Sequence, residues 1–218
     1  MDFTLDPTAA RQADQRNGRI TESGKYVGSL TRAEFITSKT GTKGVEFSFA
    51  VDENTNADYL TVWTDKADGT ALSGRKSIMA LLACLKLRGA RLGKVSVEKY
   101  DRDQGKRVTA TIEGYPDMMG KPIGVVLQKE LYTSNQGDDK ERVNIVTWFC
   151  AETERTAAEI LDRAVDPEQL PKLMAWLADH PEKDSRVKSG SRAVPDAPRR
   201  PDSKPAQNFD DLDDDIPF

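Results

Sequence analysis

Residues 59–64 alternate aromatic and aliphatic side chains, a spacing that could carry binding chemistry. Successive side chains of a strand point to opposite faces, so Leu60 and Val62 share one face, while Tyr59 and Trp63 share the other. If the aliphatic pair faces the core, the aromatic rings face solvent. There they could stack on nucleobases, at about 1–3 kcal/mol per base. A core position for Trp63 is the alternative.

Cations are the second requirement for holding a nucleic-acid strand, because they pair with phosphates. Basic side chains precede and follow the aromatic segment, and a second strand pattern near residue 148 carries another tryptophan. Each basic residue could equally be a solvated surface charge. The residues expected to contact DNA are Arg32, Lys39, Lys43, Tyr59, Trp63, Lys66, Lys121 and Trp148.

The elements that position these residues are mostly strands. Strand patterns cover residues 25–38, 45–51 and 59–64, then 95–100, 108–112, 123–132 and 143–150, with glycine-containing turns between several of them. Apolar residues from Ile78 to Leu85 recur at helical spacing, with Ser73 or Thr70 as the start and Gly89 as the end. Three strands, a helix and two further strands follow the chain order of an OB-fold. The sequence therefore predicts a mainly β protein, a five-stranded Greek-key barrel with an extra hairpin.

The remaining segments predict a modular chain. We expect a flexible arm over residues 1–22, the barrel over 23–155 and a helical extension over 156–180. Within that extension, Pro171 is expected to begin the second helix. Prolines among Ser, Gly, Arg and Asp predict a disordered linker over 181–208. A separate acidic tip follows, over 209–218.

The tip, Asp211-Leu-Asp-Asp-Asp-Ile-Pro-Phe218, has too little apolar surface to fold alone. It suits docking on another protein: Ile216 and Phe218 would fill a pocket, Pro217 lies between them, and Asp213, Asp214 and Asp215 would meet basic residues. A solubilising acidic tail is the alternative. The ending resembles the C-terminal tip of bacterial single-stranded DNA-binding proteins. That resemblance implies recruitment of a polymerase, helicase, primase or nuclease.

The body resembles a different group. Gly24-Lys25-Tyr26 and the stretch from Thr37 to Lys43 are similar to phage-encoded single-stranded DNA-binding proteins. Residues 1–150 lack the N-terminal pattern of the bacterial family, so its tetramer is not implied here and a homo-oligomer remains one option. If the chain is phage-encoded, it would act in the cytoplasm of the bacterial host.

Composition bounds these expectations. The net charge is −4, but five aspartates lie in the last ten residues, so the rest of the chain carries +1. Cys84 and Cys150 lie in apolar segments, and one histidine leaves little basis for a structural zinc site. We expect no metal, no cofactor, no secretory signal and no membrane segment, which predicts a soluble cytoplasmic protein.

An enzyme is the least favoured class. The stretch from Gly69 to Ser77 resembles a phosphate-binding loop, but Arg75 displaces Lys76 and Ser77 by one residue, about 100° around a helix. No nucleophile–base pair is evident, so we expect no catalytic residues. The sequence predicts sequence-independent binding and protection of single-stranded DNA in replication, recombination and repair, with protein recruitment by the tip. The alternatives are a recruiting adaptor that binds no DNA and a strand-annealing recombination protein.

Overall fold

The computed structural model describes residues 18–101, 105–134 and 136–186. Its centre is an antiparallel meander of three strands, β2 (Gly24–Thr37), β3 (Lys43–Ala50) and β4 (Thr55–Asp65). On β3 the side chains of Val45, Phe47 and Phe49 are buried, while Glu46 between them is half-buried. The period of two in the sequence therefore predicted this meander correctly.

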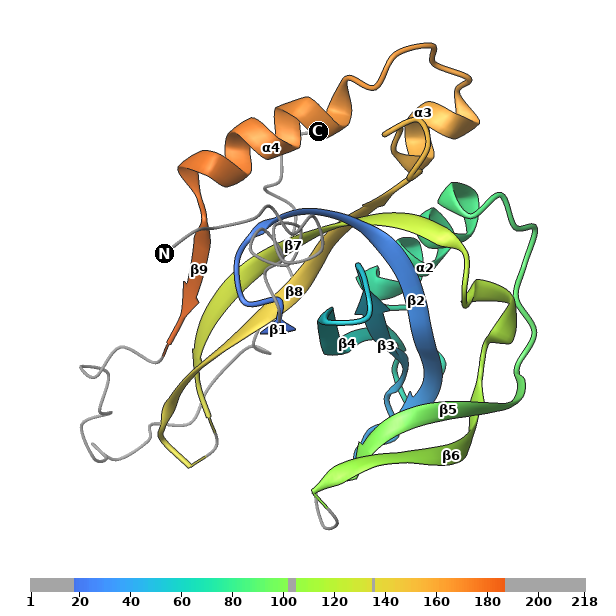
Figure 1. The fold of residues 1–218 in the computed structure, drawn as a ribbon, viewed down its shortest axis with the longest axis vertical. Helices are drawn as coiled ribbons and strands as arrows, with labels where there is room; N and C mark the ends of the chain where they lie inside the picture. The colour runs from blue at the N-terminus through green and yellow to red at the C-terminus, as the bar shows by residue number, and fades with distance from the viewer. Residues whose placement is uncertain (1–17, 102–104, 135, 187–218) are drawn as a thin grey trace, which may run out of the picture.

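Strand β2 is shared by two parts of the sheet. Its first half, Gly24 to Ser29, pairs with β7 (Pro122–Thr133), and its second half pairs with β3. The register shifts around Thr31, where a bulge bends the strand. Strand β7 pairs in turn with β8 (Asp139–Phe149). The result is a mixed sheet of nine strands, curled into a half-barrel (Figure 1). The mainly β class is confirmed.

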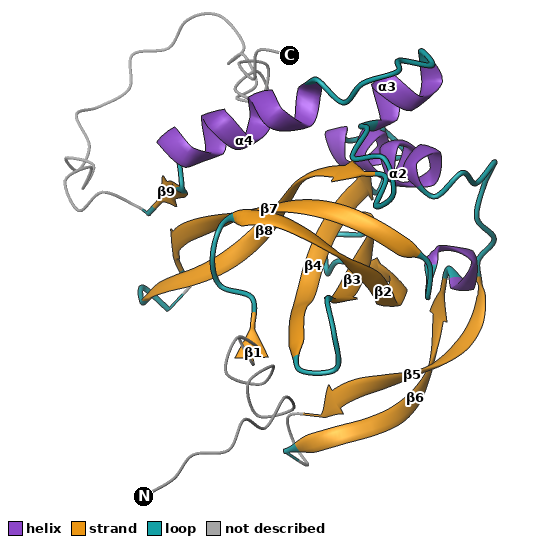
Figure 2. Ribbon diagram, turned by 45° about the horizontal axis from the view of Figure 1, so that its top comes forward, coloured by secondary structure: helices purple, strands orange, loops and turns teal. Residues whose placement is uncertain are grey.

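A second hairpin, β5 (Gly93–Asp101) and β6 (Lys106–Gly114), extends from the end of β2 (Figures 1 and 2). It joins β2 where Glu34 pairs with Gly114. A Cβ atom on Gly114 would lie 2.3 Å from the carbonyl oxygen of Ala33, so only glycine allows this close approach. The short 3₁₀ helix η1 (Pro116–Met118) then leads into β7.

Helix α2 (Ser73–Cys84) packs against β4 and β8 and confirms the predicted helical spacing, since Ile78, Leu81, Leu82 and Leu85 are buried. Its predicted ends were wrong. Leu72 is the N-cap residue, without a side-chain cap, and Ser73 is already helical. The helix ends at Cys84, and Lys86, with φ of 56°, takes the left-handed conformation that Gly89 was expected to supply.

Two shorter helices follow β8. α3 (Ala157–Leu161) begins after Thr156, as predicted, and α4 (Gln169–Asp179) lies across the outer side of β7 and β8 (Figure 2). Leu170, Leu173 and Leu177 of α4 pack on Val126 and Phe149 there. Pro171 does not begin α4. It lies in the first turn, where no backbone donor is needed and proline costs little.

Both ends of the described chain are more ordered than predicted. β1 (Gly18–Arg19) pairs in parallel with β4, and Ile20 is buried, so residues 18–22 do not belong to a free arm. β9 (Glu182–Ser185) pairs in parallel with β7, so the linker predicted from residue 181 does not begin there. The Ser23 hydroxyl joins the two ends, because it accepts from Lys129 N at 2.7 Å and donates to the carbonyl of Pro181. Residues 1–17 and 187–218 lie outside the described structure.

The two cysteines are free thiols buried at the end of α2 and of β8. Burial, with a smaller effect of Cys150, raises the pKa of Cys84 to about 12. Cys84 therefore stays protonated near neutral pH and acts as a small core residue.

Candidate nucleic-acid interface

The outer face of β4 carries the predicted aromatic pair. Leu60 and Val62 are buried at 2% and 8% exposure, whereas Tyr59 and Trp63 are exposed at 39% and 38%. Tyr59 lies in a bulge of β4 with φ of 64°, in the left-handed region that non-glycine residues rarely occupy. The expected division between a core side and a solvent side is confirmed, and Trp63 is not a core residue.

Arg32 lies on the same face, but it does not offer a free positive charge. Its side chain is 3% exposed, and its guanidinium group pairs with Glu46 at 2.7 Å and with Glu34. It also donates to the hydroxyl of Ser48 at 3.1 Å. Burial alone would lower the pKa of Arg32, but the two glutamates outweigh it and raise that pKa, so the group stays charged. Arg32, which was expected to bind phosphate, is therefore buried and paired with two glutamates instead of presenting its charge at the surface.

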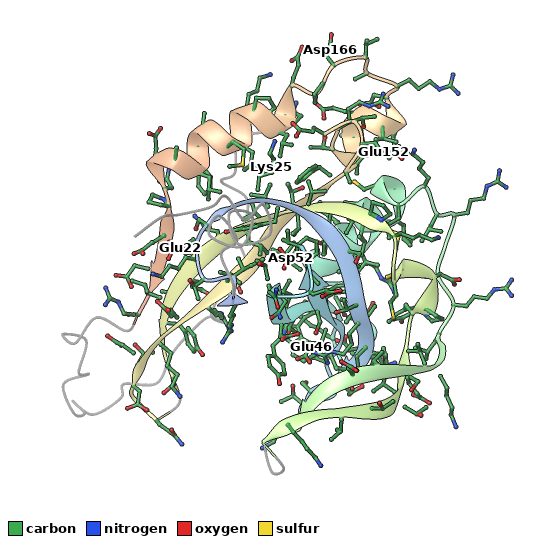
Figure 3. The ribbon with its side chains drawn as sticks, viewed as in Figure 1. Glu22, Lys25, Glu46, Asp52, Glu152 and Asp166 are labelled. Carbon is green, nitrogen blue, oxygen red and sulfur yellow. The ribbon has the colours of Figure 1, made fainter. Side chains whose placement is uncertain are left out.

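This buried cluster also affects Tyr59. The Arg32 guanidinium carbon lies 5.6 Å from the centre of the Tyr59 ring, within cation–π range. Thr61, the next outward residue of β4, donates to Glu46 at 3.4 Å. Figure 3 labels Glu46 among the strands of the meander. The part of the face around Tyr59 and Thr61 therefore contacts the Arg32–Glu46 cluster, whereas Trp63 lies outside this cluster.

Trp148, another aromatic residue expected to contact DNA, lies in the core instead of on the surface. It is fully buried, packs edge-on against Phe47 at 5.6 Å between ring centres, and donates from Nε1 to Ser77 Oγ at 3.1 Å. The reason is a bulge in β8. Leu127 of β7 lies opposite Ile145, but the preceding residue, Val126, lies opposite Thr147, so Val146 is an extra residue in β8. The extra residue reverses the alternation, so Trp148 joins Ile145 on the core side.

Three predicted lysines lie at the Trp63 end of the meander. In the backbone register of β3 and β4, Lys43 lies opposite Asp65, and its neighbour Gly44 lies opposite Trp63. Lys39 lies in the turn between β2 and β3, and Lys66 directly follows β4; all three side chains are exposed. Lys121 is also exposed but precedes β7, which meets β2 at Ser29. On β2, Ser29 is seven residues from Ile36, which lies opposite Gly44. Seven residues of extended strand span roughly 23 Å, which separates Lys121 from the Trp63 end. The structure therefore gathers Lys39, Lys43, Lys66 and Trp63, and leaves Lys121 apart.

A groove of about 510 Å³ begins beside Trp63 and runs between β4, the start of α2 and β8. It exists because β4 and β8 do not pair along these segments in the described structure. Its lining contains no charged side chain: Thr61, Val62, Trp63, Leu72, Ser73, Gly74, Ser77, Asn144, Ile145 and Val146. The sequence patterns did not predict this groove. Asn144 was its one visible signal, as a polar residue inside an apolar strand.

No family model matches the chain, and no curated protein shows significant sequence similarity to it. Within the described ranges, no helix is long and apolar enough to cross a membrane. The predicted tip residues Asp213, Asp214, Asp215, Ile216, Pro217 and Phe218 fall outside the described part of the chain.

Proposed function

We propose that this protein binds single-stranded DNA without sequence preference, through an OB-like half-barrel. The order β2–β3–β4–α2–β7–β8 follows the OB-fold, with β5–β6 inserted before β7. In OB-folds the second and third strands, with the loops after the first and fourth, bind oligonucleotides. Here these are β3 and β4, residues 38–42 and residues 134–138.

The exposed indole of Trp63 beside three exposed lysines is the observation that carries this proposal. Stacking on an aromatic ring tolerates any base, because every base has a π-face, and lysines pair with phosphates irrespective of sequence. The pairing of Arg32 with Glu34 and Glu46 restricts the favourable path to the Trp63 end of the face. The acidic tip would recruit replication or recombination proteins to the coated strand.

The test is fluorescence anisotropy of a labelled dT oligomer of roughly 30 nucleotides, with the matching duplex as control. We expect salt-sensitive binding to the single strand and weak binding to the duplex. Trp63→Ala should weaken binding, whereas Val27→Ala, which changes an exposed apolar residue of β2, should not. Absence of binding at low salt would contradict the proposal and favour an adaptor. Rapid pairing of complementary strands would instead indicate an annealing protein.

A further inference from the structure

We propose that the groove between β4 and β8 receives one unstacked nucleobase of the bound strand. The inference rests on the proposed function and names a specific subsite within it. Three hollows in the described structure differ in the charge of their linings. One, beside β2 and β5, is lined by Asp52, Glu53, Asp58 and Glu98. Another, beside α2 and η1, is lined by Asp65, Arg75 and Arg88. The hollow beside α2 and η1 is thus net positive, whereas the groove between β4 and β8 has a neutral lining that does not repel a polyanion as the acidic hollow does. Of these three hollows, the groove is the one that Trp63 lines.

The groove also offers the chemistry that a base requires. A base has apolar faces and a polar edge, and the lining combines Val62, Leu72 and Ile145 with Ser73, Ser77 and Asn144. Two of these polar groups also make internal hydrogen bonds: Asn144 Nδ2 donates to Glu130 at 2.5 Å, and Ser77 Oγ accepts from Trp148 at 3.1 Å. Trp63 stands at its rim, backed by β3: a Cβ atom on Gly44 would lie 2.9 Å from the Trp63 ring. One face of the indole is therefore supported by backbone, which limits its motion and favours stacking on the opposite face.

The two strands that border the groove remain separate. Paired strands lie about 4.8 Å apart, and closing the barrel would require β4 and β8 to approach to that distance. They do not pair with each other in the described structure. The β4 edge is partly used by the segment that leads into α2, because Leu72 N donates to Thr64 O at 2.8 Å.

Helix α2 holds the groove open. At its start, a Cβ atom on Gly74 would lie 2.2 Å from the carbonyl oxygen of Trp63, so the helix backbone rests directly on β4. One turn later, Ser77 accepts from the indole of Trp148 in β8. The groove is thus preorganised, and its volume of about 510 Å³ lies within the range of small-molecule sites.

The experiment is photo-crosslinking of the full chain to a dT oligomer that contains 4-thiothymidine, followed by trypsin digestion. Residues 44–66, with Trp63, and residues 143–155, with the β8 side of the groove, form two separate tryptic peptides. The proposed function predicts crosslinks to the first peptide, and the base subsite predicts them to both. Crosslinks confined to 44–66 would overturn the subsite and leave DNA binding intact. Crosslinks to neither would overturn both.

Substitution at the groove mouth gives a second readout. Ser73→Leu would fill the groove beside the exposed start of α2, and Ser73→Ala is the matched control. We expect Ser73→Leu to weaken dT binding about five- to hundred-fold, the equivalent of one lost base contact, and to remove the crosslink to 143–155 only. Equal affinity and crosslinks for the two variants, with equal melting temperatures, would contradict the subsite. If Ser73→Leu does not fold, the crosslinks of the parent chain to residues 143–155 still test the subsite.

Discussion

Individual side chains on the meander divide between structure and binding. Arg32 had the residue type expected at a phosphate site, yet its two glutamates and its burial make it a structural cation. Removing one partner of such a cluster leaves buried charges without compensation, which costs more than the cluster contributes net. A ligand would therefore contact exposed residues outside the Arg32 cluster, such as Trp63.

Trp63 and Tyr59 should therefore differ in their effect on DNA binding. Trp63 is clear of the Arg32 cluster, whereas the guanidinium group of Arg32 lies 5.6 Å from the centre of the Tyr59 ring. We expect Trp63→Ala to cost about 1–3 kcal/mol of binding free energy and Tyr59→Ala clearly less. Titration of labelled dT oligomers into both variants measures the difference. A larger loss for Tyr59→Ala would place the strand on the other half of the face.

Glu159 is a structural carboxylate whose effect depends on pH. Its side chain is 7% exposed and accepts from the backbone N–H groups of Thr156 (2.7 Å), Glu168 (2.6 Å) and Gln169 (2.8 Å). Burial would raise the pKa of Glu159, but these hydrogen bonds outweigh it and hold the pKa below its ordinary value. The stability that ionised Glu159 contributes is thus present above the unfolded pKa of about 4.3 and is lost as pH falls through the folded value.

Glu159→Gln should lower the free energy of unfolding by about 2 kcal/mol at pH 7. The difference from the parent should shrink as pH falls below the unfolded pKa of about 4.3, towards the lowered folded pKa of Glu159, so pH 4 is the second condition. Urea unfolding at both pH values measures it. Glu168→Gln is the control, because that exposed carboxylate pairs with Lys172 at i+4 and should change stability by less than about 0.5 kcal/mol. A difference for Glu159→Gln that does not depend on pH would contradict the assigned role.

At the scale of elements, the junction of α2 with β4 depends on one glycine. Gly74→Ala would place a methyl group 2.2 Å from the Trp63 carbonyl oxygen and force the helix away from the strand. We expect a loss of about 1–3 kcal/mol, measured by thermal unfolding. Gly89→Ala is the matched control, since a Cβ atom there would meet nothing within 4 Å in the described structure, and it should be neutral or slightly stabilising. Equal melting temperatures for the two variants would show that the contact is not tight.

For the whole molecule, salt dependence reports how many phosphates the protein meets. On single strands log K falls with log salt at about −0.7 for each phosphate contact. Replacing Lys39, Lys43 and Lys66 together by alanine should therefore reduce the slope by about 2, whereas Lys121→Ala should leave it unchanged. Binding measured at several salt concentrations tests both. A change of slope with Lys121→Ala would extend the interface beyond the region that the structure gathers.

The tip gives a prediction that separates binding from recruitment. Deleting residues 209–218 removes five aspartates, so DNA affinity should stay equal or rise, while binding of replication proteins should be lost. Anisotropy with a dT oligomer and pull-down of polymerase, helicase and primase provide the two readouts. A large loss of DNA affinity would mean that the tip belongs to the DNA site.

The sequence alone determined the mainly β class, the three-strand meander, helix α2 and the outward aromatic pair on β4, because local periodicity specifies which side of an element is apolar. Tertiary structure decided what local periodicity cannot express. A bulge in β8 turned Trp148 inward, and Arg32 pairs with Glu34 of its own strand and Glu46 of β3. Pairing with β7 ordered residues 182–185, and the lack of pairing between β4 and β8 in the described structure opened the groove. Each of these outcomes depends on how strands pair with one another, which the periodicity within a single strand does not specify.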